Sequence, residues 1–292
     1  MVSFECRWQL AIGTWLLCAG LAAGDEPERL TSDGRFKSSP VFVNEHELIY
    51  VELTSPTLFR LVRMNLADRT VEPFDPDTKL SELEPAFAGN GRYFACIETR
   101  GTLSLGVKIQ DRERKQESLV PPPKGFAGYR SPTISPNGER VVFSLAEGGQ
   151  QDLYSVNIKG EDRQRLTEGS INNWPNYSPD GTRIAFGSSR DGNFEIYSMK
   201  VDGSDARRLT NSPYQDVRPR YSADGQRIAF TSARDGNFEI YVMNADGSKL
   251  QRITDHPERD DYPSWHADGK RVVVVSERAG KHDLYLVKVE AM

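Results

Sequence analysis

Cysteine is scarce in this chain of 292 residues, which contains only Cys6, Cys18 and Cys96. Two of the three lie in the first 24 residues, so the rest of the chain keeps a single thiol and no intrachain disulfide can form there. Cys96 lies in the apolar run 92–97, with no histidine beside it. This setting indicates a small core residue of a strand and not a nucleophile.

A hydrophobic run long enough to cross a membrane is also missing. The apolar segment from Trp8 to Ala23 has about 16 residues, whereas a spanning helix needs roughly 20. The segment follows Arg7 and ends in small residues before Asp25, which is the order of a secretory signal peptide cleaved near Gly24. We therefore expect residues 1–24 to be a signal peptide and residues 25–292 to form one domain, periplasmic or secreted, with no membrane span.

The chain lacks the short motifs of common enzyme classes. It has no G-x-S-x-G nucleophile elbow, because the segment 101–106 has the wrong spacing, and no glycine loop for phosphate. Its histidines show no metal-ligand spacing; they are His46, His256, His266 and His282. The net charge of −5 does not favour a nucleic-acid partner. We predict no catalytic residues, no metal ligands and no cofactor.

What the sequence does contain is a repeat. A proline followed two residues later by a bulky apolar residue recurs every 43 to 47 residues. A period of this length with strand-like content is typical of a β-propeller. The six copies are Pro40-Val-Phe42, Pro85-Ala-Phe87, Pro132-Thr-Ile134, Pro175-Asn-Tyr177, Pro219-Arg-Tyr221 and Pro263-Ser-Trp265.

Each period contains the signals of four strands. In the copy that starts at Pro175, the turn Asp180-Gly181 precedes a second strand at 183–186. The segment 189–197, which recurs at 233–241, is rich in oxygen ligands but does not match an EF-hand loop, and it predicts a hairpin turn before a third strand. An Arg-Leu-Thr triplet at 208–210 predicts a fourth strand. Four strands per period make one propeller blade.

The last period is incomplete, and its missing strand is found at the other end of the chain. The sequence stops at Met292, before a fourth strand can form, while Arg29-Leu30-Thr31 matches the fourth-strand triplet ahead of the first blade. We therefore predict an all-β fold: a six-bladed propeller with four-stranded blades, closed into a ring by the strand around Arg29–Thr31. A closed ring hides the sheet edges that would otherwise promote aggregation.

The best-formed repeats resemble a known family. The strings 221–230 (YSADGQRIAF) and 239–247 (EIYVMNADG) are similar to the repeats of the TolB family, related to WD-type propellers. The resemblance covers about residues 28–292 and is strongest in the last four blades. It implies a periplasmic propeller that docks other envelope proteins, as TolB binds the peptidoglycan-associated lipoprotein Pal. From it we expect a protein-binding scaffold of the cell envelope, monomeric, with a Pal-like lipoprotein as partner.

The resemblance has one departure. TolB carries an α/β domain before its propeller, whereas here the expected signal peptide leads directly into the closing strand. The same repeats also resemble propellers attached to serine peptidases and those of some lyases, so the fold alone does not decide the function.

The candidate site lies in the segments just before each proline, where the chain passes from one blade to the next and where the sequence differs most between blades. We expect these segments to line one mouth of the central channel. They mix carboxylates, aromatics and arginine, the residue types that anchor interfaces. The predicted partner-binding residues are Glu82, Glu84, Tyr129, Arg130, Asn172, Asn173, Trp174, Asp216, Arg218, Asp260, Asp261 and Tyr262.

Two alternatives use the same mouth. Its carboxylates could hold a cation such as calcium. The cluster of Asp216, Asp260, Asp261 and Arg218 could instead serve an enzyme, either a metal-dependent polysaccharide lyase or a lactonase-like hydrolase.

Overall fold

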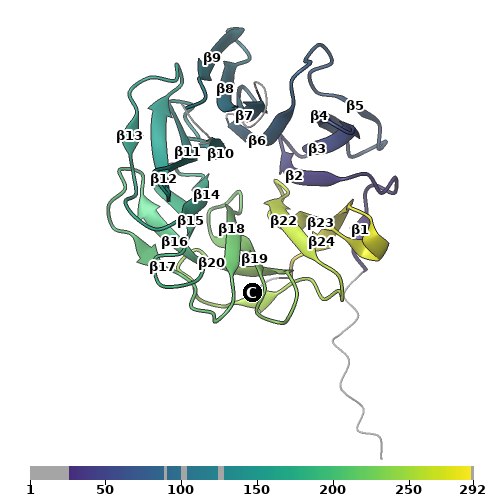
Figure 1. Ribbon diagram of the computed structural model, residues 1–292. Helices are drawn as coiled ribbons and strands as arrows, with labels where there is room; N and C mark the ends of the chain where they lie inside the picture. Colours follow the sequence, from purple (N-terminus) through teal and green to yellow (C-terminus); the bar gives the residue numbers. More distant parts are fainter. Residues whose placement is uncertain (1–25, 89–90, 100–103, 124–127, 291–292) are drawn as a thin grey trace, which may run out of the picture.

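The computed structural model describes residues 26–88, 91–99, 104–123 and 128–290. These residues form six four-stranded antiparallel sheets arranged around a central axis (Figure 1). The predicted all-β, six-bladed propeller is confirmed. The predicted signal peptide, residues 1–24, lies outside the described residues. Among the residues described, no helix is both long and apolar enough to span a bilayer.

Each blade runs from an inner strand beside the axis to a short outer strand. Blades 1 to 3 consist of β2 (Lys37–Phe42), β3 (Glu47–Ser55), β4 (Leu58–Asn65) and β5 (Val71–Pro73); β6 (Glu82–Ala88), β7 (Tyr93–Thr99), β8 (Leu105–Asp111) and β9 (Gln116–Val120); and β10 (Tyr129–Ile134), β11 (Arg140–Glu147), β12 (Gln150–Asn157) and β13 (Gln164–Arg165). Blades 4 to 6 consist of β14 (Asn172–Tyr177), β15 (Arg183–Ser188), β16 (Glu195–Lys200) and β17 (Arg207–Arg208); β18 (Asp216–Tyr221), β19 (Arg227–Ser232), β20 (Glu239–Asn244) and β21 (Gln251–Arg252); and β22 (Asp260–Trp265), β23 (Arg271–Ser276), β24 (Asp283–Lys288) and β1 (Glu28–Arg29).

The core lies between neighbouring blades. The second strand of each blade is buried on both faces, because the blades pack face to face, and this explains its nearly continuous apolar sequence. One cluster, for example, joins Val142 and Leu153 of blade 3 to Ile184 and Phe186 of blade 4. Cys96 is fully buried in such a cluster, as expected, and burial raises the pKa of its thiol.

Within the described residues, the predicted turns form at Asp-Gly and Asn-Gly pairs such as Asp180-Gly181. The turn between β15 and β16 places Gly192 at a φ of 114°, a conformation that a residue with a Cβ rarely adopts. The repeated segments 189–197 and 233–241 are therefore hairpins, as predicted, and they join the second and third strands of blades 4 and 5.

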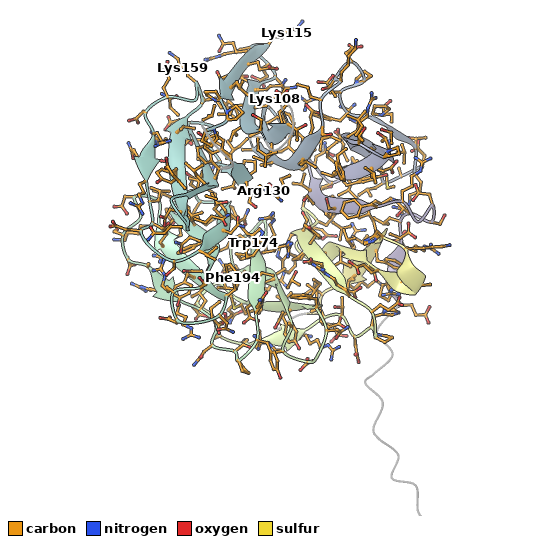
Figure 2. The ribbon with its side chains drawn as sticks, in the orientation of Figure 1. Lys108, Lys115, Arg130, Lys159, Trp174 and Phe194 are labelled. Carbon is orange, nitrogen blue, oxygen red and sulfur yellow. The ribbon has the colours of Figure 1, made fainter. Side chains whose placement is uncertain are left out.

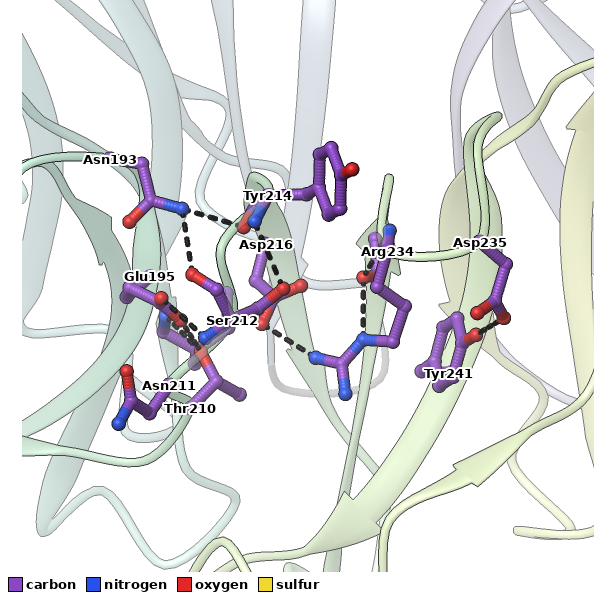
Figure 3. Close-up of polar contacts among 12 residues, drawn as sticks. Asn193, Glu195, Thr210, Asn211, Ser212, Tyr214, Asp216, Arg234, Asp235 and Tyr241 are labelled. Atoms are coloured by element: carbon purple, nitrogen blue, oxygen red, sulfur yellow. Dashed lines mark hydrogen bonds and ion pairs between the residues drawn. The ribbon is translucent and has the colours of Figure 1, made fainter.

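The fourth-strand triplets, Arg-Leu-Thr or Arg-Ile-Thr, have a shared role that we call the clasp. In blade 4, the Thr210 hydroxyl donates to the buried carboxylate of Glu195 (2.5 Å) and accepts from the backbone N–H of Ile196 (2.9 Å) (Figure 3). Arg208 donates to the same carboxylate (2.9 Å). Blades 3 and 5 repeat these contacts with Asp152, Arg165 and Thr167, and with Glu239, Arg252 and Thr254. The clasp fixes an outer strand of only two residues to its blade.

A clasp also closes the ring. β1 pairs with β24, with Arg29 opposite Tyr285, and the two strands lie side by side in Figure 1. Arg29 binds the Asp283 carboxylate (2.6 Å), while Thr31 donates to it (2.8 Å) and accepts from the N–H of Leu284 (2.9 Å). The predicted closure is therefore confirmed, and the segment around Leu30 lies beside the strand around Tyr285.

Apolar packing supports the same joint. One buried cluster contains Leu30 together with Tyr50 and Met64 of blade 1 and Val273 and Leu286 of blade 6. The cluster joins the two ends of the described chain through burial of apolar surface, which is worth about 25 cal/mol per Å².

The closing carboxylate yields a prediction about stability. Burial raises the pKa of Asp283, but hydrogen bonds from Arg29 and Thr31 and the charge of Lys37 outweigh it, so the pKa is lowered overall. A carboxyl group with a lowered pKa stabilises the fold above its unfolded pKa, about 4, and this contribution is lost as the pH falls through the folded value. We predict that Asp283→Asn lowers the free energy of unfolding by about 3 kcal/mol at pH 7 and by less at pH 3, because the contribution of the carboxylate shrinks below the unfolded pKa. Denaturant unfolding of variant and wild type at both pH values measures this.

The matched control is Glu168→Gln, because the Glu168 side chain is 86% exposed. It should change the free energy of unfolding by less than about 0.5 kcal/mol at either pH. An Asp283→Asn penalty that is equal at pH 7 and pH 3 would contradict this account of the closure.

Candidate functional site

Every inner strand carries a β-bulge at the same place. The register with the second strand shifts across the residue before the proline and the proline itself in all six blades. A proline, which has no N–H to donate, is tolerated in a sheet at such a bulge. The residue before each proline has a left-handed φ between 49° and 56°. These six residues, which we call the mouth ring, are Ser39, Glu84, Ser131, Trp174, Arg218 and Tyr262.

The bulges surround a central cavity of about 580 Å³. All six residues of the mouth ring line it. The residues that follow each proline form a second circle of lining side chains, which we call the middle ring: Val41, Ala86, Thr133, Asn176, Arg220 and Ser264. The volume lies in the range of pockets that hold small ligands, so the channel has room for part of a binding partner.

Six of the twelve predicted site residues line this cavity. They are Glu84, Arg130, Asn173, Trp174, Arg218 and Tyr262. Figure 2 shows Arg130 and Trp174 beside the centre of the ring, in contrast to Lys115 and Lys159 at its periphery. These six therefore lie at the channel, and their role in binding a partner stays a prediction.

The other six lie elsewhere, which corrects their expected position at the mouth. Each is at most 3% exposed and none lines the cavity; they are Glu82, Tyr129, Asn172, Asp216, Asp260 and Asp261. Five of them stand three residues before a proline, at the first position of an inner strand. The alternation of side chains along a strand, interrupted only at the bulge, directs this position into the blade and away from the axis.

The strongest cluster at the mouth is a stack of three side chains. The guanidinium of Arg218 lies 4.3 Å from the centre of the Tyr262 ring and 5.1 Å from that of Trp174. The carboxylate of Asp261, buried beneath the stack, pairs with Arg218 (3.3 Å). Gly187 leaves the space that the indole occupies, since a Cβ there would lie 2.8 Å from it. Asp261 and the space at Gly187 therefore fix the stack, and its three side chains all line the cavity.

A second contact crosses from blade 2 to blade 3. Glu84 pairs with Arg130 (2.8 Å) and accepts from the backbone N–H of Ser131 (2.6 Å). Glu84 is the only acid among the described residues that line the cavity, and this pairing neutralises it. Arg218 is paired with Asp261, so Arg220 is the cation on the wall without an ion-pair partner among the described residues, and it makes the cavity positive although the whole chain carries −5.

The buried position three residues before the proline contacts the clasp of the preceding blade. Asn172 donates to Asp152 (3.1 Å), and Lys37 lies 3.8 Å from Asp283. Asp260 occupies the same place beside Glu239. Burial raises the pKa of Asp260, and repulsion from Glu239 adds to the shift, although Ser276 and Arg278 oppose it. The ionised form of Asp260 therefore opposes folding.

A test follows from comparing Asp260 with its neighbours in the other blades. A carboxyl group with a raised pKa destabilises the fold above its unfolded pKa, about 4, and this cost disappears at lower pH. We predict that Asp260→Asn, which installs the amide found at position 172, raises the free energy of unfolding by about 1 to 3 kcal/mol at pH 7. The gain should vanish near pH 3, as measured by denaturant unfolding.

Asp255→Asn is the control, because Asp255 is 70% exposed and should leave the stability almost unchanged. A loss of stability in Asp260→Asn at neutral pH would contradict this account, because it would show that the ionised carboxylate of Asp260 stabilises the folded state.

Of the three aspartates that suggested a cation or an enzyme, Asp216 and Asp261 are engaged with arginines, whereas Asp260 forms no ion pair among the described residues. Asp216 pairs with Arg234 (2.8 Å) (Figure 3), and Asp261 pairs with Arg218 and Arg259. Across the described ranges, no three His, Cys, Asp or Glu side chains are grouped so that they could hold a metal ion.

Arg220, Tyr221 and Trp265 also line the cavity, although none of them was among the predicted site residues. The signal was present, because Arg220 is the only charged residue among the six that follow the repeat prolines. The bulge is what turns the residue after each proline toward the channel, and this bulge was not predicted from the sequence.

Comparison with known proteins places this architecture in a family. The TolB β-propeller domain family matches residues 77–217, and the Tricorn protease N-terminal β-propeller domain matches residues 200–291. The Tol-Pal system protein TolB of Hydrogenovibrio crunogenus is 29% identical over 91 residues, 30% of this chain and 20% of that protein. The repeats of residues 77–217 are thus those of the TolB β-propeller family, and the chain is a TolB-like propeller.

Solved structures of TolB proteins share the fold of this TolB-like propeller. A putative TolB from Agrobacterium tumefaciens has a TM-score of 0.68 at 22% identity, covering 90% of this chain and 93% of that one. TolB from Acinetobacter baumannii has a TM-score of 0.67 at 20% identity, covering 84% of this chain and 64% of that one. The chain thus matches less than two thirds of the length of that TolB.

Propeller enzymes share the fold as well. An oligogalacturonate lyase in complex with manganese has a TM-score of 0.63 at 14% identity, and a gluconolactonase from Xanthomonas campestris has 0.66 at 16%. At these identities the similarity concerns the fold alone, so the function of this TolB-like propeller has to be argued from its own channel.

Proposed function

We propose that this TolB-like propeller is an exported binding scaffold of the cell envelope that docks a partner protein, such as a Pal-like lipoprotein, at the mouth of its central channel. The observation that carries the proposal is the stack of Trp174, Arg218 and Tyr262 at the rim of an open cavity. Tryptophan, tyrosine and arginine are the side chains that most often dominate binding energy at interfaces.

Exposed apolar groups extend the same face. The inner strands all begin on the side of the ring where the mouth ring lies. Tyr214, 54% exposed, precedes β18, and the exposed Ile171 and Phe36 precede β14 and β2. A rim of exposed apolar side chains around a cavity with fixed anchors suits a partner that covers the mouth and inserts a segment into it.

The stack is also preorganised. Phe194 supports the indole of Trp174 from the turn between β15 and β16, with ring centres 5.1 Å apart (Figure 2). Asp261 holds Arg218 in place. Because these side chains are already ordered, a partner loses little of its binding energy to fixing them.

We predict that Trp174→Ala weakens binding of Pal from the same genome at least tenfold, because truncation removes the aromatic anchor and one face of the Arg218 stack. Isothermal titration of the full chain with purified Pal measures the affinity. A loss of tenfold or more corresponds to about 1.4 kcal/mol or more.

The matched control is Leu250→Ala, which removes an exposed apolar side chain ahead of the outer strand β21, outside the cavity lining. It should bind Pal like the wild type. Equal affinities of wild type, Trp174→Ala and Leu250→Ala would move the docking face away from the channel mouth, and no binding by wild type would remove Pal as the partner.

A further inference from the structure

One residue of the middle ring differs in kind from the other five. Val41, Ala86, Thr133, Asn176 and Ser264 are small and uncharged, whereas Arg220 extends a guanidinium into the same cavity. Figure 1 shows that β18, which carries Arg220, is one of the inner strands around the axis.

The structural role of this position does not account for an arginine. At the equivalent places, Thr133 and Asn176 accept hydrogen bonds from the backbone N–H groups of Tyr177 (3.4 Å) and Tyr221 (2.7 Å) in the following blade. In blade 5 the hydrogen bond to the following blade uses the backbone carbonyl of Arg220, which accepts from the indole N–H of Trp265 (3.0 Å). The side chain of Arg220 is not needed for it.

Arg220 has no anionic partner among the described residues. Its one hydrogen bond goes to the carbonyl of the adjacent Pro219 (3.3 Å), and none of the ion pairs includes it. The acid on the cavity wall, Glu84, is held by Arg130. Burial and the neighbouring charge of Arg218 lower the pKa of Arg220 to about 10, against the opposing effect of the more distant Glu84 carboxylate, so the guanidinium remains charged at neutral pH without an ion-pair partner of its own.

Arg220 is half-buried. A guanidinium partly removed from water is stabilised when an anion pairs with it, and its planar fork matches a carboxylate with two parallel hydrogen bonds. We propose that Arg220 is the receptor for a carboxylate side chain carried by an extended acidic segment of the docked protein, inserted through the mouth ring into the channel. The inference rests on the proposed function and names the chemistry of the segment that enters.

The surroundings favour such a segment. The inserted chain passes the Trp174–Arg218–Tyr262 stack at the rim and reaches Arg220 one step deeper, so that two cations and two aromatic rings line its path. In a low-dielectric channel with a positive wall, a carboxylate gains more from pairing than it would at an open surface.

The test is titration calorimetry of the full chain with a capped tetraglutamate peptide, with capped tetraglutamine as the uncharged probe. Wild type should bind tetraglutamate and not tetraglutamine, and binding should weaken as salt is raised. Arg220→Gln should weaken tetraglutamate binding at least tenfold, while Arg220→Lys, which keeps the charge but loses the fork, should fall between the two. Thermal unfolding should show Arg220→Gln at least as stable as wild type, because it removes an uncompensated charge.

Arg207→Gln is the matched control, because the Arg207 side chain is 68% exposed on the outer strand β17. It should bind tetraglutamate like wild type. Equal affinity of wild type and Arg220→Gln, or no binding by wild type at millimolar peptide, would overturn the proposal. Tighter, Arg220-dependent binding of trigalacturonate than of tetraglutamate would also overturn it, in favour of an acidic glycan.

Failure of this inference differs from failure of the proposed function. If Pal binding depends on Trp174 but not on Arg220, the docking face stands and the carboxylate receptor does not. If Pal binding is insensitive to Trp174, the docking face itself is wrong, whatever the peptide titrations show.

Discussion

A threonine hydroxyl that bridges a buried carboxylate and a backbone N–H is the contact on which this ring depends. It occurs in blades 3, 4 and 5 and again at the joint between the chain ends. There Thr31 binds Asp283, which lies near the other end of the sequence. An outer strand of two residues has few ladder hydrogen bonds of its own. The arginine and threonine of the clasp supply the additional polar contacts, and the apolar cluster around Leu30 supplies the burial. Without that joint, the channel would have no fixed circumference.

A closed ring separates the residues that carry stability from those that are free to bind. The blade contacts use buried apolar side chains and the polar residues three positions before each proline. The bulge then projects the residue before the proline and the one after it into the channel. Because the bulge repeats in all six blades, side chains as different as Ser39, Trp174 and Arg218 occupy equivalent places. Variation at the mouth therefore changes the binding surface without changing the frame, as is typical of sites built on rigid scaffolds.

The architecture could be predicted from the sequence because its signals are local and periodic. The proline spacing, the turn pairs and the orphan triplet at Arg29–Thr31 fixed the number of blades and the closing strand. The site could be predicted only in part. The segments before the prolines were identified, but Asp216 and Asp260 were expected at the channel mouth. The repeat prolines alone did not reveal which neighbouring side chains the bulge turns toward the axis. Arg220 was not predicted because it stands out by lacking an ion-pair partner. Ion pairs between blades can be assigned only when the three-dimensional structure is known.

The central claim is that a partner occupies the channel mouth, and intrinsic tryptophan fluorescence tests it most directly. Among the described residues the tryptophans are Trp174 and Trp265, and both line the cavity. Titration of the full chain with Pal should shift the tryptophan emission, and the shift should saturate together with the calorimetric isotherm. A saturating isotherm with unchanged emission would show that the partner binds elsewhere on the ring and would contradict the account.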